Sequence, residues 1–178
     1  MKLLRTIRLD ASDSFVFEQA AEPGEWAVSG VFAFARCDPR SLRGRARTAF
    51  RAGFLGVGSL GRSTLAQIVE ASEHDRSTVV DGLARQLVAH FGAPGVETAR
   101  LAAEEEVSFA ASLCDHPAGV LVAVTRSQDD GTIREAFRTL RPRERALHAR
   151  AFEFLEVVGD DMPSEPIELA GPGKGAQR

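Results

Sequence analysis

Apolar residues along this chain follow the two spacings that distinguish strands from helices. Residues 65–69 and 119–124 are short, nearly continuous apolar runs, which is typical of strands buried in a core. Within residues 79–91, apolar side chains recur every three or four positions, as they do on one face of an amphipathic helix. Ser72 and Asp75 occupy near capping-box positions just before this helix. The pattern therefore predicts a helix that lies in sequence between two buried strands.

The N-terminal part of the chain begins with extended segments. Leu3, Ile7 and Leu9 alternate with polar neighbours, and residues 15–17 form a second short extended run. Large and small side chains then alternate through residues 26–35, so that the large ones share one face. We expect a single strand over 26–35 whose large side chains face the helices.

Three further segments have helical patterns. Asp38 can cap a helix and Pro39 suits its first position, so an arginine-rich helix is expected to begin there and to end before the glycines that start at Gly53. Residues 98–114 are predicted to form a second long helix. Residues 143–158 have the apolar spacing of an amphipathic helix.

The segment that follows the second buried strand fits two structures. Asp130-Gly131 is a strong signal for a hairpin turn between two strands. Thr132 and Glu135, however, also have the spacing of a capped helix over residues 132–140. We favour the hairpin and keep the helix as the alternative.

These elements predict an α+β fold with a mainly antiparallel sheet covered on one face by helices. The chain has 178 residues and is 44% hydrophobic, which is enough for one substantial core. We expect a single domain over residues 1–160 and a flexible tail, rich in Pro and Gly, over residues 161–178.

Charge and cysteine content indicate a soluble, cytoplasmic protein. Lys and Arg number 22 against 25 for Asp and Glu, so no overall positive field favours nucleic acid. Arg5 and Arg8 interrupt any signal-peptide core, and no apolar run is long enough for a membrane span. Cys37 and Cys114 are far apart and form no disulfide framework, which agrees with a reducing compartment.

A glycine-rich loop surrounded by arginines is the strongest candidate for ligand binding. Gly56, Gly58 and Gly61 match the spacing of a dinucleotide-binding loop, whose backbone amides hold a phosphate. The segment after them resembles a strand instead of the required helix, so a simple glycine-rich turn is the alternative. Arginine side chains beside free amides can bind anions, and five of them surround this loop in the sequence: Arg43, Arg45, Arg47, Arg51 and Arg62. The candidates are Arg43, Arg47, Arg51 and Arg62, and a solvated helix face is the alternative.

Glu106 is the candidate for a buried acid. It is the one member of a run of three glutamates that is expected to project among apolar residues of its helix, between Ala102 and Phe109. A carboxylate in such a place needs a positive partner or backbone donors, or else it is protonated. A structural ion pair and a catalytic acid are both open.

No set of residues identifies a reaction. Cys114, Asp115 and His116 are adjacent but point in different directions, so we predict no metal site and no cofactor. No catalytic triad or dyad can be assembled, and catalytic residues stay unassigned.

Four stretches of the sequence resemble a proteobacterial family of small proteins of unknown function. They are MKLLRTIRLD (1–10), EPGEWA (22–27), AFRAGFLG (49–56) and FAASLCDHP (109–117), and the resemblance extends to about residue 141. Genes of that family tend to lie near those for respiratory molybdenum enzymes such as formate dehydrogenase. The resemblance therefore implies an accessory role only by association.

We thus expect a non-enzymatic cytoplasmic accessory or binding protein linked to redox-enzyme assembly, whose partner is a redox enzyme or its assembly factor. The alternative is a small-molecule enzyme or sensor that binds an anionic, phosphate-containing ligand at the arginine- and glycine-rich region.

Overall fold

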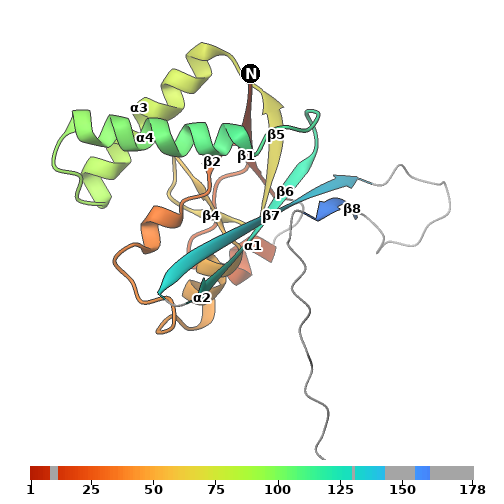
Figure 1. Cartoon of the computed structure of the whole chain (residues 1–178), viewed down its shortest axis with the longest axis horizontal. Coiled ribbons are helices and arrows are strands. Elements are labelled where there is room, and N and C mark those ends of the chain that lie inside the picture. The colour runs from red at the N-terminus through yellow and green to blue at the C-terminus, as the bar shows by residue number, and fades with distance from the viewer. Residues whose placement is uncertain (9–11, 130, 143–154, 161–178) are drawn as a thin grey trace, which may run out of the picture.

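The computed structural model describes residues 1–8, 12–129, 131–142 and 155–160, and it confirms the α+β class (Figure 1). Eight strands within these residues form one curled sheet in the order β4-β3-β2-β1-β5-β6-β7-β8. All of its strand pairings are antiparallel. The strands are β1 (Lys2–Ile7), β2 (Trp26–Val28), β3 (Phe54–Gly56), β4 (Arg62–Ser63), β5 (Leu65–Glu70), β6 (Leu121–Asp129), β7 (Thr132–Pro142) and β8 (Leu155–Asp160).

The two long helices cover the sheet as the apolar patterns predicted. They are α3 (Glu73–His90) and α4 (Val96–Ser112), and α4 packs on β1 and β2 while α3 packs on α4. Their buried side chains meet those of the central strands in one apolar cluster, which includes Leu4, Ile68, Leu83, Val107 and Val122.

The predicted start of α3 is confirmed in detail. The Ser72 hydroxyl accepts a hydrogen bond from the Asp75 backbone N–H, at 3.1 Å, and the Asp75 carboxylate accepts one from the Ser72 N–H, at 2.9 Å. Both bonds of a capping box are therefore present, and they satisfy donors that the first turn of a helix leaves free.

The hairpin after the second buried strand is also confirmed, and the helical alternative for residues 132–140 is wrong. β6 pairs with β7 along its whole length, from Leu121 opposite Leu140 to Asp129 opposite Thr132. Gly131 has a φ of +82°, the left-handed conformation that glycine adopts readily at such a turn.

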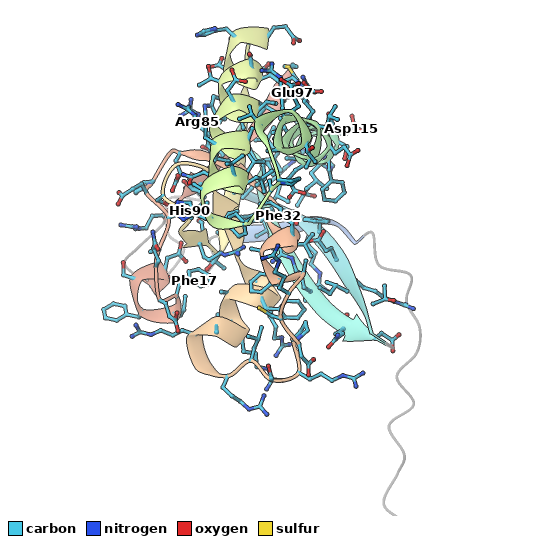
Figure 2. All side chains as sticks on the ribbon, turned by 90° about the vertical axis from the view of Figure 1, so that its left-hand side faces the viewer. Phe17, Phe32, Arg85, His90, Glu97 and Asp115 are labelled. Carbon is cyan, nitrogen blue, oxygen red and sulfur yellow. The ribbon has the colours of Figure 1, made fainter. Side chains whose placement is uncertain are left out.

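The predicted strand over residues 26–35 is wrong in its second half. β2 ends at Val28, and Val31–Phe34 form a short 3₁₀ helix, η1. The break lies at Gly30, whose φ of +71° is incompatible with a strand. A side chain at Gly30 would also collide with Leu55 on β3. Beyond the break, the Phe32 ring meets the Phe91 ring edge-on at 5.1 Å, beside the C-terminal end of α3 (Figure 2).

Two other local predictions are also wrong. Residues 15–17 are not extended, because Ser12–Val16 form the short helix α1 and Phe17 is buried directly after it. The arginine-rich helix, α2, spans Gly44–Ala52 and does not begin at Asp38. The Asp38 carboxylate instead accepts a hydrogen bond from the Arg40 N–H at 3.0 Å, which closes a separate turn before α2.

The predicted helix over residues 143–158 is wrong where it can be compared. Residues 155–158 belong to strand β8, which pairs with β7. The rest of that segment and the tail over residues 161–178 lie outside the described residues. Within the described ranges, every helix is too short or too polar to cross a membrane.

Candidate anion-binding site

Three charged side chains converge on the backbone of Ser29 and Gly30, where β2 ends. The Ser29 carbonyl accepts a hydrogen bond from Arg126 Nη2 at 2.5 Å. The Gly30 N–H donates to Glu106 Oε1 at 2.8 Å, and the Gly30 carbonyl accepts from Arg62 Nη1 at 3.4 Å. The break in the strand thus supplies the polar groups around which the charges are arranged.

Arg126 is completely buried but fully partnered. Its side chain is 0% exposed, and its Nε lies 2.7 Å from Glu135 Oε1. Its Nη1 donates to the carbonyls of Phe50, at 3.0 Å, and Gly53, at 2.9 Å, where α2 ends. Burial lowers the pKa of Arg126, and the neighbouring Glu135 carboxylate opposes that effect. Arg126 therefore connects β6 to the ends of β2 and α2.

Arg62 is also buried, but no salt bridge joins it to a carboxylate of the described residues. It is 9% exposed, and its Nη1 makes two long hydrogen bonds, to the carbonyls of Gly30 at 3.4 Å and Gly53 at 3.3 Å. Its guanidinium lies over the Phe34 ring, 4.7 Å from the centroid. Burial, followed by repulsion from Arg126, lowers the pKa of Arg62 to about 10.

Arg62 faces a surface hollow of about 200 Å³. The hollow lies between the segment after α1, the 3₁₀ helix η1, the helix α2 and the glycine-rich loop before β4. Its lining residues are Glu18, Gln19, Phe34, Arg45, Ala46, Ala49, Leu60 and Arg62. A buried cation and an exposed cation, Arg45, thus share one small concave site with an apolar wall.

Of the four candidate arginines, only Arg62 lines this hollow. Arg43, Arg47 and Arg51 are exposed and are not among its lining residues. The Arg43 guanidinium donates to the carbonyls of Arg40 and Leu42, which are close to it in the sequence. The arginine from α2 that does line the hollow is Arg45, which is one of the five arginines near the loop in the sequence but not one of the four candidates.

The glycine-rich loop holds an anion that belongs to the protein itself. The Glu25 carboxylate accepts hydrogen bonds from the N–H groups of Gly58, at 2.7 Å, and Ser59, at 2.8 Å, and from the Ser59 hydroxyl. Side chains at Gly56 and Gly58 would collide with this carboxylate, and one at Gly61 with the Ala20 backbone. The glycine spacing is thereby explained by close packing. Binding of an external anion at this loop stays a prediction, and such an anion would have to displace Glu25.

Glu106 is half-buried and lies at the edge of the buried face of α4, not in its middle. The buried positions are Ala99, Ala103, Val107 and Ala110, whereas Phe109 is 39% exposed. The expected helix phase was therefore off by about one residue. Burial raises the pKa of Glu106, and Glu135 adds to the shift, whereas the Gly30 N–H and Arg126 oppose it.

The residues that sequence reasoning missed are Ser29, Arg126 and Glu135. Arg126 shares the alternate positions of Val122 and Val124 on β6, and this spacing of two is a signal that places it on the buried face. Ser29 and Glu135 carry no comparable signal. They meet only because the fold joins residues 106 positions apart.

The other candidate groups are separate from this site. Cys37 is exposed and Cys114 is buried, and burial raises the pKa of the Cys114 thiol to about 11. Among the residues that the structure describes, no group of three His, Cys, Asp or Glu side chains could hold a metal ion.

Fold and site together define a small α+β protein with two buried arginines, one of which, Arg62, lines a surface hollow. A family model for DUF6505, a family of unknown function, matches residues 1–155, so the protein belongs to that family. No curated protein and no solved structure matches the sequence.

Proposed function

We propose that this protein binds a small anion at Arg62 and Arg45 and acts as a binding protein, not as a catalyst. The observation that carries the proposal is the state of Arg62. It is 9% exposed, it has no carboxylate partner among the described residues, and it lines a hollow that is open to solvent.

The energetics of a buried cation favour an added anion. Burying a charge costs several kcal/mol unless the charge is paired and hydrogen-bonded. The two hydrogen bonds of Arg62 are 3.3 and 3.4 Å long, and Arg126 repels it. An anion in the hollow would offset this cost, and the exposed guanidinium of Arg45 would add a second attraction.

The size of the hollow limits the ligand. Sites for drug-sized ligands and cofactors have volumes of about 300–1,000 Å³. The hollow beside Arg62 has about 200 Å³. It therefore suits an anion of a few heavy atoms and not a dinucleotide, which is the ligand that the glycine spacing alone indicates.

A binding role is supported over a catalytic one by the residues that line the hollow. They include no Ser, Cys, His or Lys, so no nucleophile and base meet there. Glu18 is the one carboxylate among them and it is exposed.

The resemblance noted in the sequence supports a cytoplasmic accessory role, with a redox enzyme or its assembly factor as partner. An apolar groove between α3 and α4 would suit such a partner. It is lined by Ala84, Val88, Ala89 and Val96, with Asp81, Arg85 and Arg100 also beside it. Val96 and the nearby Leu101 are exposed, although large apolar side chains usually gather in cores.

Anion binding is tested by thermal denaturation at constant ionic strength in chloride, phosphate, sulfate, acetate and propionate. A specific ligand raises the midpoint by mass action, by about 2.7 kcal/mol of stability at 100 times its Kd. Some of these anions also stabilise proteins without a site, so matched variants are required.

The matched variants are Arg45→Ala and Arg47→Ala. Both arginines are exposed on α2, but only Arg45 lines the hollow. We expect at least one anion to stabilise the wild type and Arg47→Ala more than Arg45→Ala. Equal shifts in all three proteins for every anion would overturn the proposal.

A further inference from the structure

We infer that the anion is a small monocarboxylate with a short apolar tail. This inference rests on the proposed anion site and names the chemical class of its ligand. Three features of the hollow carry it: its formal charge, the donor edge that Arg62 leaves free, and its apolar wall.

The formal charge of the hollow matches one negative charge. Its lining contains two guanidinium groups, Arg45 and Arg62, and one carboxylate, Glu18. A carboxylate ligand therefore leaves the site neutral. A phosphate group carries about −1.5 to −2 at pH 7, which would leave excess negative charge facing Glu18.

The free donors of Arg62 match two oxygens. Its Nη1 uses both of its hydrogens, on the carbonyls of Gly30 and Gly53. Nε and Nη2 make no hydrogen bond to the described residues. Because these two groups form one edge of the planar guanidinium, they suit the paired oxygens of a carboxylate.

The rest of the hollow is apolar and fixed. Ala46 and Ala49 lie one turn apart on α2, Leu60 belongs to the loop before β4, and all three line the site. The Phe34 ring is held edge-on against Phe50, with 5.3 Å between the centroids. A tail of one to three carbons would bury apolar surface here, at about 0.8 kcal/mol for each CH₂.

Such a carboxylate has two sources, a free acid or the C-terminus of a peptide. Isothermal titration calorimetry of the full-length protein with acetate, propionate, N-acetylalanine, phosphate and sulfate separates them. We expect propionate to bind about fourfold more tightly than acetate, which is the affinity gain from one buried CH₂. Phosphate and sulfate should bind at least tenfold more weakly than propionate.

Two variants test the cause of the preference. Glu18→Gln should improve phosphate affinity more than propionate affinity, because it removes the one negative charge of the lining. Ala46→Leu, a change to another good helix former, should weaken propionate more than acetate, because the larger side chain fills the space for the tail.

The outcomes are distinct. Tighter binding of phosphate or sulfate than of either carboxylate would overturn the monocarboxylate inference and leave the anion site standing. No binding by any anion of the panel would overturn both. N-acetylalanine binding above propionate would support a peptide C-terminus as the source, and the reverse order would support a free acid.

Discussion

Arg126 and Arg62 are both buried, yet only Arg126 pairs with a carboxylate within the described part of the molecule. The difference separates a structural role from a binding role. Arg126 has hydrogen bonds to the backbone of Ser29, Phe50 and Gly53 in addition to its ion pair with Glu135. Arg62 leaves one donor edge free beside a hollow.

Removal of the charge on Glu135 tests the structural role. Glu135→Gln leaves a buried guanidinium without its counter-charge, and we expect a loss of about 3–5 kcal/mol in the free energy of unfolding. Urea denaturation at pH 7 measures it. Asp129→Asn is the matched control on the same hairpin, because Asp129 pairs with Arg134 on the surface, at exposures of 58% and 72%. The control should lose less than about 1 kcal/mol, and equal losses would contradict the assignment.

The raised pKa of Glu106 predicts how stability changes with pH. Above the ordinary value of 4.5 the unfolded state releases its proton first, while the folded state keeps it. The folded state then binds more protons, so this contribution to stability is full below pH 4.5 and falls as pH rises toward the folded-state pKa. Glu106→Gln mimics the protonated form and should remove the fall.

Urea denaturation of the wild type and Glu106→Gln between pH 4 and pH 8 measures this effect. As the pH rises above 4.5, the wild type loses the stability that the raised pKa of Glu106 contributes. The variant should therefore become more stable relative to the wild type as the pH rises. Glu105→Gln, at an exposed position of the same helix, is the control. A difference that does not change with pH would show that Glu106 ionises as freely in the folded protein as in the unfolded state.

At the scale of elements, the sequence correctly predicted the helices and strands for which the apolar pattern agrees with the capping or turn residues at the ends. The helix α3 has both an apolar stripe and a capping box, and β5 and β6 are apolar runs beside clear turns. The segment after Val28 has an equally clean alternation, but its conformation depends on Leu55 and Arg62, which pack against Gly30. Such contacts are not visible in a local pattern.

The site shows the same limit. Arg62 was found because arginines and glycines cluster near it in the sequence, whereas Arg126, Ser29 and Glu135 were missed. The hydrogen bond between Arg126 and the Ser29 carbonyl joins residues 97 positions apart. In the sheet, β1 and β5 lie between β2 and β6. The curl of the sheet therefore brings these side chains together, and a local sequence pattern does not show it.

Gly30→Ala tests whether this break is needed. The substitution puts a side chain into a left-handed conformation, with φ of +71°, and against Leu55. We expect a loss of about 1 kcal/mol from the backbone and about 1–3 kcal/mol from the collision. Gly24→Ala is the control, because Gly24 has a φ of +79° but open space around it. Urea denaturation should show the larger loss for Gly30→Ala, and similar losses would mean that Leu55 moves aside freely.

At the scale of the whole molecule, one apolar cluster extends from the sheet to both long helices. It contains Leu4 of β1, Ile68 of β5, Leu83 of α3 and Val107 of α4. The buried charges border this cluster, because Arg126 donates a hydrogen bond to the Gly53 carbonyl and the next residue, Phe54, belongs to the cluster. A continuous core of this kind indicates that the sheet and the helices unfold together.

Leu83→Ala tests this cooperativity and with it the prediction of a single domain over residues 1–160. Leu83 is fully buried, so we expect its truncation to cost about 2–5 kcal/mol. Leu101→Ala on α4 is the control, because Leu101 is 65% exposed and should change stability by less than about 0.5 kcal/mol. Urea unfolding should be followed by circular dichroism, which reports mainly helix, and by fluorescence of the single Trp26, on β2. Because the core is shared, Leu83→Ala should shift both transitions to the same lower midpoint. A shift in the helical signal with an unchanged Trp26 transition would mean that the two long helices unfold independently of the sheet.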